Sequence, residues 1–508
     1  MGSNQSNLHV RGSTAPPSSE TESYRSITSW QRGHWVSPMQ RIPPEILSEI
    51  FIYCVLIDNE QFVRPRFRTA PLLLLRICRY WRDRAMSTPQ LWCSLQIHDV
   101  KFTNRRRRLD DAKLLDLQSA RLSSEMAMLG DWLSRARGQQ LSLRIHFSGT
   151  LPDQAPECYE VLRYWFSGCH VLSLSVSREW LEVLSGLGCS VLEDFTIEVP
   201  HPPRTFGNVF SLQFPCHAPS LRRLTLKNTA DMVVPYLAIS PTSLKEMHCH
   251  DVLLSTNLVE FLKGCESLIS WSMLSLHLPR NMEDSIGDMT LPNLEELVIS
   301  DYSKRGEACS FLQNPDLHLP NLRRLDLNPK ASGIANVASI TAFATRSGCT
   351  LTHLKMHSSI PVCSEVAEFR ALLSAIPSLE VLHIQTREVP ICSEDGSSIS
   401  IFASLMRPPA EAGLIHRLPC LSDLAITTTC IPPGVPSATY IENMIRSRTQ
   451  DHDYVGHNVA RLTSVMITLA VSSAVPMTVR WHRLVAGRLS RELTVEHFNT
   501  YCVEEVTL

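Results

Sequence analysis

One spacing recurs along most of this 508-residue chain. It consists of an apolar residue, two others, a second apolar residue, one other, and a third apolar residue. Eleven segments carry it, beginning at Val171, Leu192, Leu221, Leu244, Leu268, Leu294, Leu322, Leu351, Leu379, Leu421 and Leu462. By subtraction, neighbouring starts lie 21, 29, 23, 24, 26, 28, 29, 28, 42 and 41 residues apart. Because side chains alternate between the faces of a β-strand, the second and third apolar residues of each segment would share one face. The pattern predicts one strand unit repeated many times.

A turn signal precedes most of these segments. A proline stands shortly before the strand at Pro219, Pro241, Pro292, Pro320, Pro377 and Pro419, and a glycine–cysteine pair does so at Gly168, Gly188, Gly264 and Gly348. Both signals end a helix and turn the chain into a strand. The first eight intervals fit leucine-rich repeats, roughly 20–29 residues long, and insertions would lengthen the last two. We therefore expect an α/β fold in which residues 151–508 form a leucine-rich-repeat-like solenoid with a parallel sheet on its concave face.

The first 150 residues precede these eleven segments. Residues 1–38 are rich in Ser, Thr, Gln, Asn and Pro without an apolar period, which predicts a disordered tail. Apolar residues at helical spacing then predict a helix that begins at Pro43 and a second helix over residues 72–85, within a helical module of residues 39–98. Residues 99–150 would form a helical linker into the repeats. So small a module cannot cover all its large apolar side chains, and we expect it to bind a partner.

Three stretches of the module carry a resemblance. They are Ile42-Pro43-Pro44-Glu45-Ile46-Leu47, Leu74-Leu75-Arg76-Ile77-Cys78-Arg79-Tyr80-Trp81-Arg82 and Pro89-Gln90-Leu91-Trp92. Together they resemble the F-box of the large fungal F-box families, whereas the rest of the chain matches those families only in architecture. The chain departs from their pattern in three ways: Ile42 replaces the usual Leu, residues 58–68 lengthen the loop between the helices, and Thr229 and Lys330 stand where a repeat would have an Asn or Cys ladder residue.

The resemblance implies a function. F-box proteins are known for docking on a Skp-type adaptor, which joins them to a cullin and a RING subunit, while their C-terminal repeats select the protein to be ubiquitinated. It therefore implies a substrate-recognition subunit of an SCF-type ubiquitin ligase, with no catalysis and no cofactor of its own. Carried over by position, the adaptor-facing residues would be Ile42, Pro43, Ile46, Leu47, Ile50, Phe51, Leu75, Cys78 and Trp81. The alternative is an interaction scaffold that uses the same two modules without joining a ligase.

The repeats predict a second binding surface. Residues between the apolar positions of each strand would face the concave side. The candidates for substrate binding there are Arg223, Glu246, His248, Glu296, Arg324, Asp326, His353, Lys355 and His383. Their mixed charge fits a protein epitope better than an anionic polymer. The formal net charge, 48 − 50 = −2, gives no general attraction to nucleic acid or to an anionic membrane.

Several shorter patterns resemble functional sites or would identify an enzyme. His248-Cys249-His250 resembles a metal fragment, but strand alternation would point Cys249 inward and both histidines outward. The chain has no P-loop, nucleotide-binding glycine motif, nucleophile elbow or zinc-protease motif, which agrees with a binding protein. An enzyme with its active site in an insertion at 392–420 remains a third possibility, although that segment reads as an exposed loop.

Other patterns concern location. Sixteen cysteines without a C-x-x-C pair, and no secretory signal, favour reduced thiols and a cytoplasmic or nuclear protein. Gly2 fits an N-myristoylation pattern, which competes with a plain tail. Residues 105–108 are four arginines, which would form either an import signal or a solvated loop. The uncharged run of residues 462–479 predicts two strands around a turn, so no stable membrane insertion is expected.

Overall fold

The computed structural model describes residues 41–56, 61–98, 111–147, 156–176, 180, 188–199, 210–211, 218–228, 232–233, 241–254, 256–278, 288–300, 307–328, 337–358, 366–386, 418–428, 464–470, 476–483, 489–495 and 502–506. The chain divides into two compact units. Unit 1 comprises Met1–Asn59 and Arg66–Leu91, and unit 2 comprises Glu60–Pro65 and Trp92–Leu508. The predicted tail of residues 1–38 lies outside the described residues.

Unit 1 is helical where it is described. It contains α1 (Pro44–Leu56), α2 (Leu74–Ile77) and α3 (Arg79–Met86), and the 3-10 turn η2 (Pro89–Trp92) follows. Prolines suit the start of α1, because the first turn of a helix needs no backbone N–H donor there. The fully buried Leu47 and Phe51 of α1 form the core together with Leu74 and Ala85. The ring of Phe51 packs against Trp81 with centroids 5.0 Å apart.

The second predicted helix, over residues 72–85, is interrupted at Cys78. The backbone of Cys78 is extended, with φ −157° and ψ 169°, and it separates α2 from α3. The Cys78 side chain accepts a hydrogen bond from the backbone N–H of Trp81 at 3.4 Å, so it caps the start of α3. Apolar spacing alone did not reveal this break, because the apolar face continues across it.

Unit 2 is built on one 16-stranded sheet. The eleven strands predicted from the repeated spacing are all present: β3 (Cys169–Val176), β4 (Asp194–Glu198), β6 (Arg223–Lys227), β8 (Glu246–Leu253), β9 (Ser270–His277), β11 (Glu296–Ser300), β13 (Arg324–Leu327), β14 (His353–Ser358), β15 (Val381–Thr386), β16 (Asp423–Thr428) and β17 (Ser464–Ala470). They lie in this order in the sheet, and each pairs with the next in parallel. The expected α/β class with a large parallel sheet is thus confirmed.

The sheet extends beyond the predicted strands at both ends. β1 (Ser94–His98) and β2 (Leu141–Phe147) precede β3 in parallel, within residues assigned to the helical module and the linker. The last strands are instead antiparallel: β18 (Pro476–Arg483), β19 (Leu489–Val495) and β20 (Cys502–Val506). The hairpin of β17 and β18 confirms the two strands around a turn predicted for residues 462–479.

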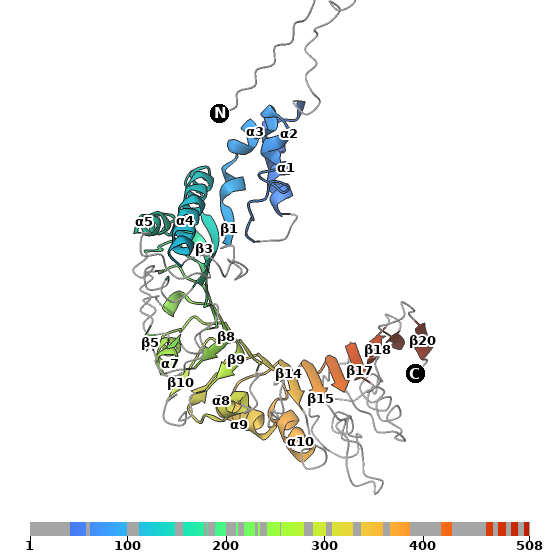
Figure 1. The fold of residues 1–508 in the computed structure, drawn as a ribbon. Coiled ribbons are helices and arrows are strands. Elements are labelled where there is room, and N and C mark those ends of the chain that lie inside the picture. The colour runs from blue at the N-terminus through green and yellow to red at the C-terminus, as the bar shows by residue number, and fades with distance from the viewer. Residues whose placement is uncertain are drawn as a thin grey trace, which may run out of the picture. The chain divides into compact units, whose positions relative to one another are not determined.

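Helices and short strands connect the strands of the sheet. The helices are α4 (Asp111–Ser134), α5 (Pro156–Phe166), α7 (Thr256–Lys263), α8 (Glu307–Gln313), α9 (Val337–Ser347) and α10 (Val366–Ala375). Short pieces are β5 (Phe210–Ser211), β7 (Met232–Val233), η4 (Pro241–Ser243), β10 (Met289–Thr290) and β12 (Leu317–His318). Figure 1 shows α7 to α10 on the outer side of the curved sheet, with the strands along its inner side. Among the described residues, helices therefore cover one face of the sheet and leave the other open.

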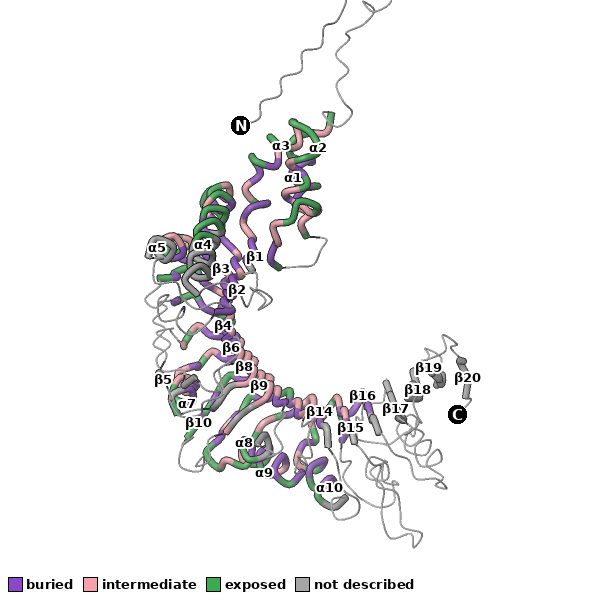
Figure 2. The backbone as a smooth tube through the Cα atoms, in the orientation of Figure 1, coloured by how far each residue is buried: buried purple, intermediate pink, exposed green. Residues whose placement is uncertain are grey.

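Alternation separates the core from the open face most clearly in β2, whose residues alternate strictly between buried and half-buried. In β6 the apolar Leu224 and Leu226 are buried and Arg223 is exposed, while Thr225 between the leucines is also buried. Figure 2 shows buried and intermediate residues along the strands of the sheet. The repeated spacing predicted these orientations, because its apolar positions obey the period of two.

A ladder of polar side chains links successive repeats. The residue directly before the first apolar position of a repeat donates a hydrogen bond to a backbone carbonyl of the preceding repeat. These bonds join Ser220 to Ser190 (3.1 Å), Ser243 to Leu221 (3.0 Å), Asn293 to Glu266 (2.8 Å), Asn321 to Pro292 (2.6 Å) and Ser378 to Leu351 (2.9 Å). The ladder thus precedes the strand, whereas the standard repeat would place an Asn or Cys three positions after it.

Candidate functional site

Two described surfaces are candidates, and the first is α1 of unit 1. Ile46, Ile50 and Tyr53 follow one another at intervals of four and three residues, which places them on one helix face. Their exposed fractions are 53%, 41% and 63%. The opposite face of α1 holds Leu47 and Phe51 in the core. The exposed row, which we call the α1 apolar row, therefore consists of large side chains that the described residues of unit 1 do not cover.

The adaptor-facing residues implied by the resemblance do not share one environment. Ile46, Ile50, Pro43 and Cys78 are exposed, and Ile42, Leu75 and Trp81 are half-buried. Leu47 and Phe51, in contrast, are fully buried inside unit 1, so they support the surface and do not form it. Near α2, Leu73 and Ile77 are also exposed. Helical spacing identified the apolar positions but could not say which ones would face the core.

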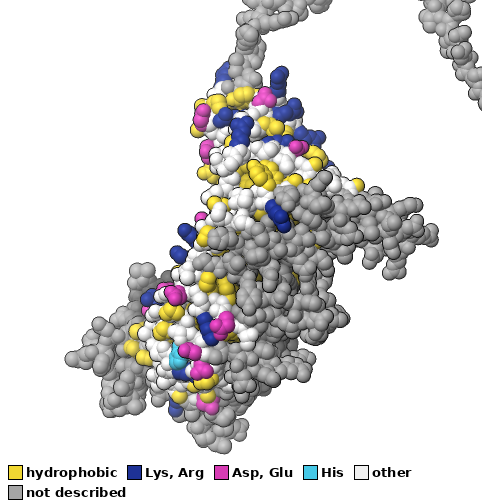
Figure 3. All heavy atoms as spheres, turned by 90° about the vertical axis from the view of Figure 1, so that its left-hand side faces the viewer, with side chains coloured by type: hydrophobic (Ala, Val, Ile, Leu, Met, Phe, Trp, Pro, Cys, Tyr) yellow, Lys and Arg dark blue, Asp and Glu magenta, His cyan; other side chains and the backbone are white. Residues whose placement is uncertain are grey.

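The charge of unit 1 accompanies its exposed apolar side chains. Its described residues contain seven arginines and three acidic residues, so 7 − 3 gives a net charge of +4. Figure 3 shows hydrophobic side chains next to Lys and Arg side chains at the top of the view, where unit 1 lies. Exposed apolar side chains on a unit of net positive charge favour a protein partner whose contact surface is apolar and acidic.

A buried polar cluster fixes α1 against the end of α3. The Ser48 hydroxyl accepts a hydrogen bond from Arg84 Nε at 2.7 Å and lies 3.1 Å from the Thr88 hydroxyl. It also lies within bonding distance of the Pro44 carbonyl, at 3.1 Å, while the Thr88 hydroxyl donates to the Arg84 carbonyl at 2.9 Å. Because both hydroxyls and Arg84 Nε are hydrogen-bonded, the cluster holds α1 and its apolar row against the end of α3.

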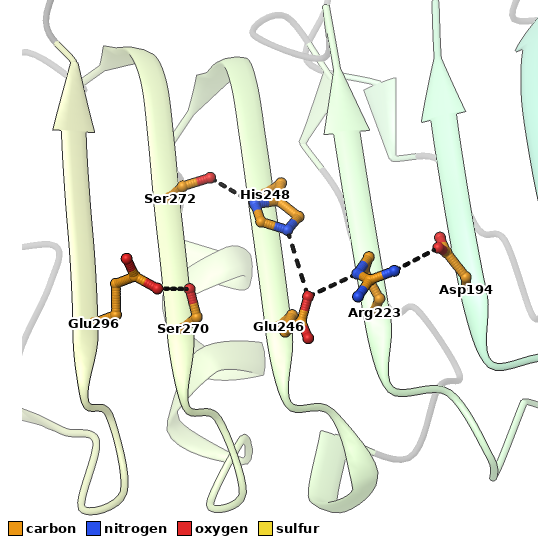
Figure 4. Close-up of polar contacts among 7 residues, drawn as sticks. All are labelled: Asp194, Arg223, Glu246, His248, Ser270, Ser272 and Glu296. Carbon is orange, nitrogen blue, oxygen red and sulfur yellow. Dashed lines mark hydrogen bonds and ion pairs between the residues drawn. The ribbon is translucent and has the colours of Figure 1, made fainter. Parts of the chain in front are cut away.

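The second candidate surface is the open face of the sheet in unit 2. Parallel pairing in register puts Asp194, Arg223, Glu246, Ser270 and Glu296 side by side on successive strands (Figure 4). Arg223 donates from Nε to Glu246 at 2.7 Å and from Nη1 to Asp194 at 3.0 Å. The hydroxyl of Ser270 donates to Glu296 at 3.1 Å. We call this row the concave ladder.

Electrostatic shifts in the ladder follow from these contacts. The hydrogen bond from Arg223 lowers the pKa of Glu246, and the bond to Glu246 raises the pKa of Arg223. Both effects favour the charged forms. Asp194, which completes the ion pair on the other side of Arg223, was not predicted as a site residue. The third position of the spacing that begins at Leu192 would have identified it.

Farther along the open face, charged residues again pair across strands. Lys355 Nζ lies 3.0 Å from Asp326, and Arg324 lies 3.5 Å from Glu296. His383 lies 3.9 Å from Asp423. Burial lowers the pKa of His353, and the positive charge of the nearby Arg324 lowers it further. The predicted residues of this face thus come together as neighbouring pairs, and Arg223, Arg324 and Lys355 already have carboxylate partners.

Ser272, His248 and Glu246 resemble the members of a hydrolytic triad. His248 Nδ1 lies 2.7 Å from the Ser272 hydroxyl, and Nε2 lies 3.9 Å from Glu246. The carboxylate is too far for a hydrogen bond to the imidazole and is bonded to Arg223 instead. The same histidine–serine pair recurs at His146 and Ser175, also at 2.7 Å and in register on β2 and β3. We therefore interpret both pairs as cross-strand contacts that order the face.

The His248-Cys249-His250 segment behaves as its alternation predicts. Cys249 is buried, and burial raises its pKa to about 12, whereas both histidines are half-buried on the open face. Among the described residues, no group of three or more His, Cys, Asp or Glu side chains could hold a metal ion. The segment therefore packs as an ordinary strand of the sheet.

Known proteins give no further guide to the site. No protein-family model matches the chain, and no curated protein matches it. Within the part that the structure describes, no helix has both the length and the apolar character needed to cross a membrane. The predictions for Gly2, for residues 105–108 and for the insertion before Leu418 lie outside the described residues.

Proposed function

We propose that this chain is a substrate-recognition subunit of an SCF-type ubiquitin ligase. In this proposal unit 1 is an F-box-like module that docks on a Skp-type adaptor, and the leucine-rich-repeat-like sheet of unit 2 holds the target protein. The observation that carries it is the α1 apolar row: a small helical unit with its own core still exposes Ile46, Ile50 and Tyr53 on one face. The role would be non-catalytic, because proximity between target and ubiquitin donor is what the chain supplies.

The features of unit 1 support docking through α1. Fully burying one large apolar side chain contributes about 1.5–3 kcal/mol, and these three are about half exposed, so a partner that covers the row gains part of that energy from each. The +4 charge of the described part of unit 1 would add attraction to an acidic adaptor surface and speed association. Leu47 and Phe51 contribute indirectly, because they hold the helix that carries the row.

The features of unit 2 support the capture of a protein epitope. The concave ladder is polar, of mixed charge and ordered by cross-strand bonds, so its side chains are held in place before a partner arrives. Because the carboxylates of neighbouring strands neutralise Arg223, Arg324 and Lys355, the face favours a mixed protein surface over nucleic acid.

Affinity capture of the full chain from cells, read by mass spectrometry, tests the proposal. The variant is the double substitution Ile46→Asp and Ile50→Asp, which places charge on the α1 apolar row without opening the core. The matched control is Tyr164→Asp, an exposed aromatic residue of unit 2 with an exposed fraction of 70%. We expect a Skp-type adaptor and a cullin with the native chain and with the control, and neither with the double variant.

The alternatives predict different results. If the native chain captures other proteins but never an adaptor or a cullin, the ligase proposal is wrong and the scaffold remains. If the adaptor is captured equally by all three proteins, it does not bind through α1. Thermal unfolding of each variant shows whether a loss of adaptor capture reflects lost binding or lost folding. We expect the variants to stay folded, because Ile46 and Ile50 lie outside the core.

A further inference from the structure

Five residues between α1 and α2 belong to unit 2. Residues 61–65 follow α1 in the sequence, yet Glu60–Pro65 form part of unit 2, and the chain returns to unit 1 at Arg66. Phe62 is only 2% exposed, and Val63 is buried as well. We call residues 61–65 the edge segment. It lies in the stretch that makes the loop between the helices long.

The edge segment lies along β1, the first strand in the order of the sheet. The backbone N–H of Gln96, in the middle of β1, donates to the Val63 carbonyl at 2.7 Å. A strand at the end of a sheet otherwise leaves N–H and C=O groups unpaired on one side, where they are free to pair with another chain. This bond gives the edge of β1 a partner from within the chain.

Side chains hold the edge segment at three further points. The Ser94 hydroxyl donates to the Gln61 carbonyl at 2.9 Å and accepts from the Val63 N–H at 3.2 Å. Arg64 Nε donates to the side-chain amide oxygen of Gln96 at 2.9 Å, and Gln96 is only 4% exposed. A buried amide needs such a partner, because leaving it unpaired is costly. One short segment thus satisfies backbone and side-chain groups of β1.

An aromatic contact ties the segment to the next strand as well. The Arg144 guanidinium of β2 lies 4.3 Å from the centre of the Phe62 ring, within the range of a cation–π interaction. Because β1 and β2 are paired in register from Ser94 to His98, the edge segment contacts both of the first two strands. Its position is therefore fixed by polar, aromatic and backbone contacts together.

We propose that the edge segment is the N-terminal cap of the sheet and that it couples the stability of β1 to the helices of unit 1. The chain passes between the two units three times, at 59/60, 65/66 and 91/92. The cap is thus joined covalently to α1 on one side and to the residues leading into α2 on the other. Loosening either helix releases an end of the cap, and a partner that stabilises those helices strengthens the cap.

Hydrogen exchange followed by mass spectrometry on the full chain tests the cap. Ser94→Ala removes both bonds of the hydroxyl. Ser142→Ala, the residue in register on β2, is the matched control, because no hydrogen bond of its hydroxyl is described. We expect Ser94→Ala to speed exchange of β1 and the edge segment about fivefold or more, since each bond contributes on the order of 1 kcal/mol. Equal protection of β1 and the edge segment in the native chain and in Ser94→Ala would show that the edge segment does not cap the sheet.

A second variant tests the coupling. Phe51→Ala weakens the core of unit 1 and leaves unit 2 unaltered in sequence. The proposal requires faster exchange in β1, while β14 and β15 remain as protected as in the native chain. If exchange rises in α1 and α3 but β1 stays protected, the coupling is refuted, even where unit 1 unfolds completely. Neither outcome depends on which protein binds unit 1, so the test is separate from that of the proposed function.

Discussion

Arg223 lies between two carboxylates on the open face of the sheet and donates to Glu246 at 2.7 Å across the β6–β8 pair. The side chains of Arg223 and Glu246 are 45% and 40% exposed, so solvent screens the ion pair. We expect Arg223→Gln to lower the free energy of unfolding by about 0.5–1 kcal/mol at pH 7. Chemical denaturation of the native chain and the variant at several pH values measures this difference.

The pH dependence of this difference has a definite sign. The pKa of Glu246 is lowered in the folded chain, so its contribution is complete above the unfolded value, about 4.3, and is lost as the pH falls through the folded value. The native chain and the variant should therefore converge in acid. Lys263→Gln breaks the exposed pair with Glu260, 2.7 Å long and within one helix, and should cost no more than about 0.5 kcal/mol. If the stability difference between the native chain and Arg223→Gln grew in acid, this pH dependence could not come from the Arg223–Glu246 pair.

Much of the sheet could be predicted from the sequence, because a strand with one buried face has a strict period of two. The spacing at Leu221, for example, places Leu224 and Leu226 inward and Arg223 outward, as the structure shows. The same rule gave most of the open-face residues. Asp194 obeys the rule too, because it follows Leu192 by two residues, as Arg223 follows Leu221.

The remainder depends on contacts that are distant in sequence. The edge of β1 is completed by residues 61–65, some thirty positions earlier by the numbering of Val63 and Gln96. In α1, Ile50 and Phe51 are neighbours with similar hydropathy, yet one is exposed and the other buried. Only the packing of Trp81 against Phe51 decides which face is the core. Local patterns contain no such information.

The buried cluster of unit 1 gives a second prediction. Ser48→Ala removes the acceptor of Arg84 Nε, 2.7 Å away, and leaves the Thr88 hydroxyl without that neighbour. We expect a loss of about 1–3 kcal/mol, because a partly buried polar group loses its partner. The control is Ser87→Ala, whose exposed hydroxyl donates to the Arg84 carbonyl at 2.9 Å and which should change stability by less than about 0.5 kcal/mol. Equal effects in urea unfolding would show that the cluster is not stabilising.

Two glycines should respond in opposite directions to alanine. A Cβ atom at Gly264 would lie 2.8 Å from Pro241 Cγ and 3.3 Å from Pro241 Cβ, and a proline ring cannot swing aside. We expect Gly264→Ala to destabilise the chain by about 1–3 kcal/mol through overpacking. Gly130 lies within α4 and would meet no atom within 4 Å, so Gly130→Ala should stabilise the chain by about 0.5–1 kcal/mol. Thermal unfolding of the two variants checks both signs.

His353 gives a prediction for the open face at mildly acidic pH. Burial lowers its pKa first, and the charge of Arg324 lowers it further. The unfolded chain therefore binds a proton near the ordinary value, about 6.5, before the folded chain does, so this residue makes stability fall as the pH drops below that value. Arg324→Gln should raise the pKa of His353 and reduce this loss. Arg323→Gln is the control, because Arg323 is not among the groups that shift His353.

The measurement is an NMR titration of ¹³C-labelled histidines in the full chain, with the His353 signal assigned by its loss in His353→Gln. We expect the His353 midpoint below 6.5 in the native chain and in Arg323→Gln, and a higher midpoint in Arg324→Gln. An unchanged midpoint in Arg324→Gln would mean that the charge of Arg324 does not contribute to the lowered pKa of His353. The charges on β13 and β14 would then act independently, and the open face would be a set of separate pairs without coupling along the sheet.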